Sequence, residues 1–234
     1  MDPLTRRARA VHRRLLAHYG PAVWRHPLPP LDEVVSTILS QNTNDLNRDR
    51  AFASLRVRFP TWEAARDAPL RSVVSAIRSA GLAQQKGPRI QGFLRALTAE
   101  RGSLDLSFLK EMPASEAHAW LRRFPGVGPK TAAIVMLFAL DLPAFPVDTH
   151  IHRVTGRLGL RPPRATAEQS HDLLARLFLP QMYSDAHLNL IRLGREICRA
   201  RRPACEVCPL TDLCDYYAVL QRKPPRRRTH EGSR

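Results

Sequence analysis

Residues 121–133 read Leu-Arg-Arg-Phe-Pro-Gly-Val-Gly-Pro-Lys-Thr-Ala-Ala. The first proline ends one helix, and Gly126 and Gly128 allow a turn with positive φ where a Cβ would be in the way. Pro129 suits the first position of the next helix, because the N–H that it lacks would have no partner there. The apolar run Ala132–Leu140 indicates that this second helix is buried. The stretch therefore predicts two helices joined by a tight hairpin.

The start of the second helix is a candidate phosphate-binding site. The first amides of a helix have no acceptor within it, so they can donate to an anion. A plain helical connection with two turn glycines is the alternative, but the adjacent Lys130 and the basic charge of the chain favour phosphate. We expect a DNA phosphate at the hairpin residues Gly126, Val127, Gly128 and Thr131.

A second motif follows the hairpin. Residues 145–153 read Phe-Pro-Val-Asp-Thr-His-Ile-His-Arg, and Asp148 lies 18 residues after Lys130. The position of Asp148 suits the N-cap of another helix, and a simple cap is one interpretation of it. Lys130 alone would be interpreted as an exposed phosphate-binding lysine. An amine and a carboxylate in one pocket can also perform covalent chemistry at a sugar carbon, so the pair is a candidate catalytic site.

Four cysteines lie within seventeen residues near the C-terminus, with the spacing C-x6-C-x2-C-x5-C: Cys198, Cys205, Cys208 and Cys214. The N-terminus shows no apolar stretch typical of a secretory signal, so a metal is favoured over disulfides. Zinc sites usually have two close cysteine pairs. A single Cys-x2-Cys with one cysteine on each side suits a [4Fe–4S] cluster. We therefore predict a [4Fe–4S] cluster, with zinc as the alternative.

The charge of the chain favours nucleic acid as a partner. Lys plus Arg is 37 and Asp plus Glu is 21, which gives a formal net charge of +16, and only four of the 37 are Lys. The planar guanidinium of Arg suits the phosphates of a polyanion. Within the loop between the first two cysteines, we expect Arg201 and Arg202 to contact a DNA backbone.

The remaining pattern predicts an all-α protein. Apolar residues recur at helical spacing from Leu31 onward, and Ala51, Leu55 and Val57 are expected on one buried face. About six short helices are expected over residues 31–140, and no period-two alternation predicts a strand. A hydrophobic content of 44% with 25% charged residues excludes a disordered chain. No apolar run approaches the roughly 18 residues that span a bilayer.

Taken together and in this order, the hairpin, the Val-Asp-Thr-His motif and the cysteine spacing resemble the endonuclease III family of base-excision DNA glycosylases, in the helix-hairpin-helix superfamily. The resemblance covers about residues 5–218. It implies two all-α domains with a DNA cleft between them. The implied parts are a six-helix barrel at 31–143 with the helix-hairpin-helix at about 118–140, and an iron–sulfur domain from 1–30 and 144–218. The basic residues that follow, 219–234, are expected to form a disordered tail, either solvated or in contact with DNA.

The resemblance also implies roles for individual residues. Lys130 matches the nucleophile and Asp148 the essential carboxylate. Leu82, within Ala-Gly-Leu-Ala, matches a wedge that enters the duplex where a base has left, because an apolar side chain can replace the lost stacking. Without the resemblance, a buried leucine after a helix-ending glycine is an equal interpretation. His150 matches a position that orients Asp148 or contacts phosphate.

One segment departs from the family pattern. The family often has Gln followed by Ala-Thr-Asp, where the Gln side chain fills the vacated base position. Residues 40–45 here read Ser-Gln-Asn-Thr-Asn-Asp, and a gapless match places Asn42 there, with Gln41 just before it. Both amides could bond to the orphaned base, but Asn is one methylene shorter. The departure leaves recognition of the opposite base and the preferred damage open.

The expected function is that of a bifunctional DNA glycosylase and AP lyase. It would remove oxidised pyrimidines from duplex DNA through a Lys Schiff base and β-elimination. The alternatives are a monofunctional mismatch glycosylase, whose relatives carry another residue such as Tyr or Ser at the position of Lys130, and a non-catalytic protein that binds DNA damage. We expect a monomer that binds duplex DNA with damaged bases or abasic sites and has no membrane partner. For a prokaryotic source, it would be cytoplasmic and associated with the nucleoid.

Overall fold

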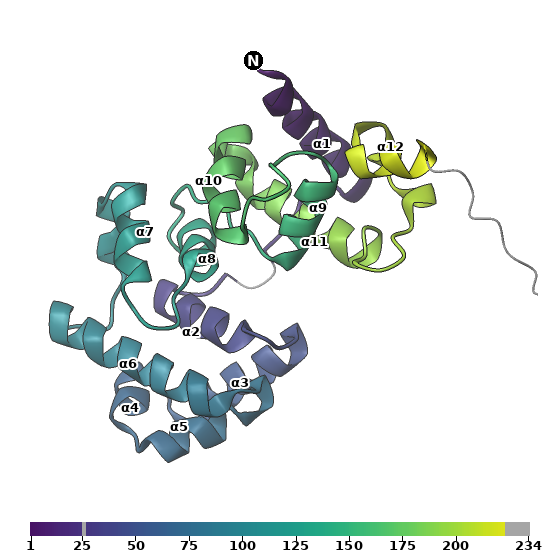
Figure 1. Cartoon of the computed structure of the whole chain (residues 1–234). Coiled ribbons are helices and arrows are strands. Elements are labelled where there is room, and N and C mark those ends of the chain that lie inside the picture. Colours follow the sequence, from purple (N-terminus) through teal and green to yellow (C-terminus); the bar gives the residue numbers. More distant parts are fainter. Residues whose placement is uncertain (25–26, 223–234) are drawn as a thin grey trace, which may run out of the picture. The chain divides into compact units, whose positions relative to one another are not determined.

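The computed structural model describes residues 1–24 and 27–222 of the chain. Within these residues every regular element is an α-helix or a 3-10 helix, and there is no strand (Figure 1). The prediction of an all-α protein is therefore confirmed. None of the described helices is both long enough and apolar enough to cross a lipid bilayer.

The chain forms two compact units. Among the described residues, unit 1 comprises Met1–Ala22, Asp148–Phe178 and Asp185–Arg222, and unit 2 comprises Val23–Val147 and Leu179–Ser184. The domain boundaries predicted from the sequence lie after residues 30 and 143, whereas the contacts within the structure divide the chain after Ala22 and Val147.

Unit 2 contains the hairpin and most of the expected helices. In chain order its elements are α2 (Pro30–Ser40), α3 (Asp45–Arg58), α4 (Trp62–Asp67), α5 (Leu70–Ala76), η1 (Arg78–Ala80), α6 (Ala83–Arg101), η2 (Ser107–Glu111), α7 (Ala114–Arg122), α8 (Pro129–Ala139) and η3 (Pro180–Met182). The described part of residues 30–140 thus has seven α-helices, one more than predicted. Thr61 caps the short α4, and Pro69 precedes α5, so two short helices form there.

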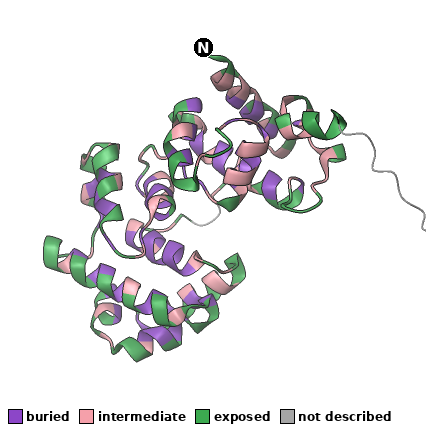
Figure 2. Ribbon diagram, viewed as in Figure 1, coloured by how far each residue is buried: buried purple, intermediate pink, exposed green. Residues whose placement is uncertain are grey.

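The core of unit 2 lies between α2, α6 and α8. Their buried apolar side chains include Ile38, Leu94 and Val135 (Figure 2). On α3, Ala51 and Leu55 are fully buried, but Val57 is 83% exposed. The prediction for Val57 was wrong because a residue two positions along a helix lies about 200° around it.

Unit 1 joins the start of the chain to its cysteine-rich end. Its elements are α1 (Pro3–Tyr19), α9 (Thr149–Arg157), α10 (Ala167–Leu177), α11 (Tyr183–Glu196), η4 (Cys205–Val207), η5 (Thr211–Leu213) and α12 (Asp215–Arg222). Arg7 and Arg14 of α1 form ion pairs of 2.9 Å with Asp215 and Asp212. Residues 219–222, expected as the start of a disordered tail, belong to α12, and the remainder of that tail lies outside the described residues.

Candidate functional site

The hairpin between α7 and α8 uses its two glycines differently. Gly126 has φ of 91°, and a Cβ there would lie 2.8 Å from the Cδ of Arg89. Gly128 has φ of −86° and ψ of 179°, and a Cβ there would meet nothing within 4 Å. The prediction of positive φ was therefore wrong for Gly128. The physical reason is Pro129, which restricts the preceding residue to extended backbone.

The N-terminus of α8 is open to an anion. Gly128 is its N-cap, and no side chain within the described residues caps it. The first hydrogen bond into the helix runs from the amide of Ala132 to the carbonyl of Gly128, at 3.0 Å. Thr131 is buried, whereas Lys130 is exposed. This combination of uncapped amides, helix dipole and exposed lysine can hold a phosphate.

The turn after α2 places its two amide side chains differently. The Nε2 of Gln41 donates to the carbonyl of Gly126 at 2.8 Å, and the Nη1 of Arg89 donates to the Oε1 of Gln41 at 3.4 Å. Asn42 is exposed and has φ of 53°. The side chain of Gln41 is thus engaged with the hairpin, whereas that of Asn42 faces solvent.

Leu82 lies in the turn before α6 with an unfavourable backbone conformation and an exposed side chain. It is the N-cap of that helix with φ of 50° and ψ of 32°, and its side chain is 47% exposed. A non-glycine residue in this left-handed conformation costs about 1–2 kcal/mol. An exposed leucine also forgoes the stabilisation of burial. Neither cost is explained by packing of the core, which favours a binding role over the alternative of a buried leucine.

Asp148 is the N-cap of α9, as its position in the sequence predicted. Its Oδ1 accepts a hydrogen bond of 2.8 Å from the amide of Ile151. His150 follows in the first turn, where its Nδ1 lies 3.1 Å from the Nη2 of Arg153. Asp148 therefore belongs to unit 1, and Lys130 belongs to unit 2.

All four cysteines line one cavity in unit 1: Cys198, Cys205, Cys208 and Cys214. Burial raises the pKa of the last three thiols, and the neighbouring cysteines add to the effect. Thiols with raised pKa values stay protonated near neutral pH unless a bound metal stabilises the thiolates. Four cysteine sulfurs around one cavity are the ligand set of a [4Fe–4S] cluster, so the residues present fit this group.

Arg157 of α9 organises the loop that follows Cys198. Its guanidinium donates to the carbonyl of Arg199 at 2.7 Å, to that of Ala200 at 3.0 Å and to the Sγ of Cys198 at 3.3 Å. It also lies 4.7 Å from the ring centroid of Tyr216, a cation–π distance. Sequence reasoning missed this residue.

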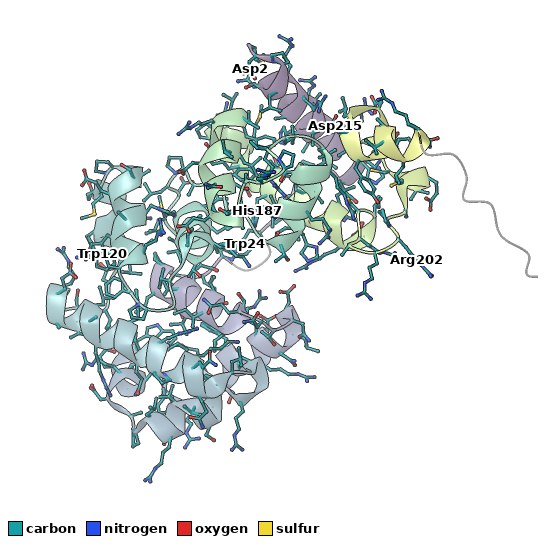
Figure 3. All side chains as sticks on the ribbon, in the orientation of Figure 1. Asp2, Trp24, Trp120, His187, Arg202 and Asp215 are labelled. Atoms are coloured by element: carbon teal, nitrogen blue, oxygen red, sulfur yellow. The ribbon has the colours of Figure 1, made fainter. Side chains whose placement is uncertain are left out.

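The side chains of the same loop face outward. Arg201 and Arg202 are exposed, and Figure 3 shows the side chain of Arg202 pointing away from the ribbon. Arg202 has φ of 49°. Arg153, one turn before Arg157 on α9, also donates to the carbonyl of Cys198, at 3.0 Å. Two arginines at helical spacing just after the Asp148 motif were the signal that could have identified this support.

Comparisons with known proteins agree with this arrangement. Residues 35–180 match the family model of the HhH-GPD superfamily base excision DNA repair protein, and residues 198–214 match the iron-sulfur binding domain of endonuclease III. Endonuclease III of Thermotoga maritima is 32% identical over 200 residues, which are 86% of this chain and 89% of that protein. An Arabidopsis thaliana protein named for DNA glycosylase activity is 36% identical over 79% of this chain, but the match spans only 66% of that protein.

A solved structure of a non-covalent endonuclease III–DNA complex superposes with a TM-score of 0.80 at 26% identity, over 94% of this chain and 99% of that one. The helical fold, the hairpin and the thiol cavity together define a helix-hairpin-helix protein with an iron–sulfur centre. The chain belongs to the HhH-GPD superfamily of base excision DNA repair proteins, and it is of the endonuclease III type. The predicted [4Fe–4S] cluster is confirmed by this domain and its four cysteines.

The two hairpin glycines provide a matched pair of variants. We expect Gly126→Ala to lower the melting temperature by about 3–8 °C, because alanine is strained at this φ and its methyl group displaces Arg89. DNA binding should weaken as well. Gly128→Ala should melt within about 2 °C of the wild type, since its backbone suits any residue and its surroundings are open. Equal losses in the two variants, measured by thermal melting, would contradict this assignment.

Metal analysis tests the cysteine site. The purified protein should contain about four irons per chain, as one [4Fe–4S] centre requires. Cys208→Ser should lower the iron content and the melting temperature together, because the cluster folds a segment with little apolar core. One zinc per chain with negligible iron would show that the alternative ligand is correct.

Proposed function

We propose that the protein is a bifunctional DNA glycosylase and AP lyase that removes oxidised pyrimidines from duplex DNA. The observation that carries this proposal is the exposed Lys130 at the open N-terminus of α8, beside a hairpin suited to phosphate. A phosphate held by the helix amides would bring a nucleotide next to this amine. Membership of a base excision repair superfamily supports the same chemistry.

The proposed reaction uses two side chains on one nucleotide. The unprotonated amine of Lys130 attacks the sugar C1′, and the damaged base departs with the bonding electron pair. The attached nitrogen loses a proton, the C1′–O4′ bond breaks as O4′ takes up a proton, and a protonated Schiff base between C1′ and Nζ results. Loss of a proton from C2′ then expels the 3′ phosphate by β-elimination, which cuts the strand. The carboxylate of Asp148 stabilises the positive charge that develops on the sugar.

The cap on α9 suits Asp148 to this role. One carboxylate oxygen, Oδ1, is held by the amide of Ile151, which fixes the orientation of the side chain. A carboxylate has a second oxygen, and we propose that this oxygen faces the sugar. A fixed charge needs little reorganisation when the transition state forms, and this is the usual source of electrostatic catalysis.

In this proposal, the turns of unit 2 that carry Asn42 and Leu82 recognise the damaged nucleotide. A base must leave its stack to be excised, and damage lowers the cost of that step. We propose that Leu82 fills the stacking gap and that Asn42, not Gln41, bonds to the unpaired partner base. The basis for the choice is that the amide of Gln41 already donates to Gly126.

The loop held by the cluster supplies further contacts to the backbone. The [4Fe–4S] cluster, when bound, fixes the fold of the loop between Cys198 and Cys205. Exposed Arg201 and Arg202 then bind phosphate, and such contacts carry no sequence information. His150 lies in the first turn of α9, next to the cap at Asp148, where it can contact a neighbouring phosphate.

Borohydride trapping on abasic duplex DNA tests the nucleophile. We expect Lys130→Gln to reduce the covalent adduct by several orders of magnitude, because the only attacking amine is gone. Lys110→Gln is the matched control, since Lys110 is an exposed lysine in η2, and it should trap like the wild type. Undiminished trapping by Lys130→Gln would refute the role. Base release without any trapping in the wild type would identify a monofunctional glycosylase.

Two substitutions at Asp148 separate the effect of its charge on base release from the effect of its helix cap on stability. Asparagine also caps helices well, so Asp148→Asn should melt like the wild type while single-turnover base release falls sharply. Asp148→Ala should lose base release and, in addition, about 1 kcal/mol of stability with the cap. DNA binding should persist in both, because a negative charge near phosphate has been removed. Full excision by Asp148→Asn would rule out the electrostatic role.

A further inference from the structure

Lys86 is a buried lysine that the proposed reaction does not use. Its side chain is 1% exposed, and its Nζ donates to the carbonyls of Leu39 at 2.7 Å and of Ala80 at 2.8 Å. No carboxylate is among its partners in the described part of the chain. Burial lowers the pKa of Lys86, and the positive charge of Arg89 lowers it further.

The two carbonyls belong to two turns with exposed, left-handed residues. Leu39 is the penultimate residue of α2, three positions before Asn42 with φ of 53°. Ala80 ends η1, two positions before Leu82 with φ of 50°. Carbonyls at helix ends lack the amide of a following turn, so one ammonium satisfies both and ties the turns together.

The position of Lys86 is unfavourable for its own helix. It is the fourth residue of α6, where the helix dipole disfavours a positive charge, and burial of the charge adds a second cost. Gln91 on the same helix shows that a neutral side chain can serve such carbonyls. Its Nε2 donates to the carbonyls of Ala65 and Ala68 at 2.9 and 2.8 Å, at the end of α4.

The start of α6 also contacts the hairpin. Arg89, three residues after Lys86, donates to the side chain of Gln41 and packs where a Cβ of Gly126 would lie. Gly87 brings this part of α6 close to α5, since a Cβ there would lie 2.8 Å from the Cγ2 of Val74. The first two turns of α6 thus contact the turn after α2, the turn before α6 and the hairpin.

We propose that Lys86 is a positioning residue that fixes Asn42 and Leu82 relative to each other, so that both can enter the gap left by a flipped nucleotide. The inference rests on the proposed function, because the gap exists only if a base leaves the stack. Lys86 acts through the two turns and does not touch DNA. Its loss should therefore impair recognition of the gap more than binding to intact duplex.

The test measures how much more tightly the protein binds a duplex containing a tetrahydrofuran abasic analogue than an undamaged duplex. We expect Lys86→Met to lower this ratio by about three- to tenfold, with undamaged binding nearly unchanged. A 2-aminopurine beside the analogue should report less unstacking. In a double-mutant cycle, Lys86→Met should add little to Leu82→Ala, because both changes remove the same wedge contact.

Gln91→Met is the matched control. It removes equivalent bonds from a buried side chain of α6, so it should lower the melting temperature but leave the ratio unchanged. If Lys86→Met does not fold, Lys86→Leu, which is shorter and also lacks the N–H donors, replaces it in the cycle. Three outcomes would overturn the inference. The Lys86 variant could keep the wild-type binding ratio, or the Gln91 variant could lose as much of this ratio as the Lys86 variant does. In the cycle, the effects of the Lys86 substitution and of Leu82→Ala on the ratio could also multiply. A wild-type protein with no preference for the analogue would instead contradict the proposed function.

Discussion

Unsatisfied backbone groups at helix ends are the constraint on which this structure depends. Every helix leaves amides without acceptors at its start and carbonyls without donors at its end. Here Lys130 lies at the uncapped start of α8, Asp148 caps α9 and Leu82 precedes α6. The same ends that need partners inside the fold are those that can accept a phosphate or hold a charge in place.

The segment from Cys198 to Cys214 also has main-chain carbonyls that need donors, and it has few buried apolar side chains. Between Cys198 and Cys214 only Leu210 is a buried apolar residue, so hydrophobic packing cannot hold the segment. Arg157 satisfies its carbonyls from one side, and the cluster ties its four thiolates together. Because Arg157 and the cluster hold the backbone of the loop, its side chains Arg201 and Arg202 can be exposed while the backbone keeps a defined conformation.

Local patterns were sufficient for part of the fold and of the site. The helix cap at Asp148 and the cysteine spacing each depend on neighbours in sequence, and both could be predicted. The φ of Gly128 was missed because the effect of the following proline was not weighed. The role of Lys86 could not be assigned from the sequence, because one of its two acceptors, the carbonyl of Leu39, is 47 residues away. The spacing of Arg153 and Arg157 was a signal, but the carbonyl of Arg199 that Arg157 binds is 42 residues away.

These long-range bonds also change how the net charge of +16 should be interpreted. Lys86, Arg153 and Arg157 donate to main-chain carbonyls, and Arg161 does so as well, at 3.0 Å to the carbonyl of His152. A cation engaged in this way stabilises the fold and is a poor partner for phosphate. The salt dependence of DNA binding reflects only those side-chain cations that contact phosphates and thereby release counterions. The basic composition therefore indicates a polyanion as partner, but its contacts must be sought among exposed residues such as Arg201 and Arg202, and not in the total charge.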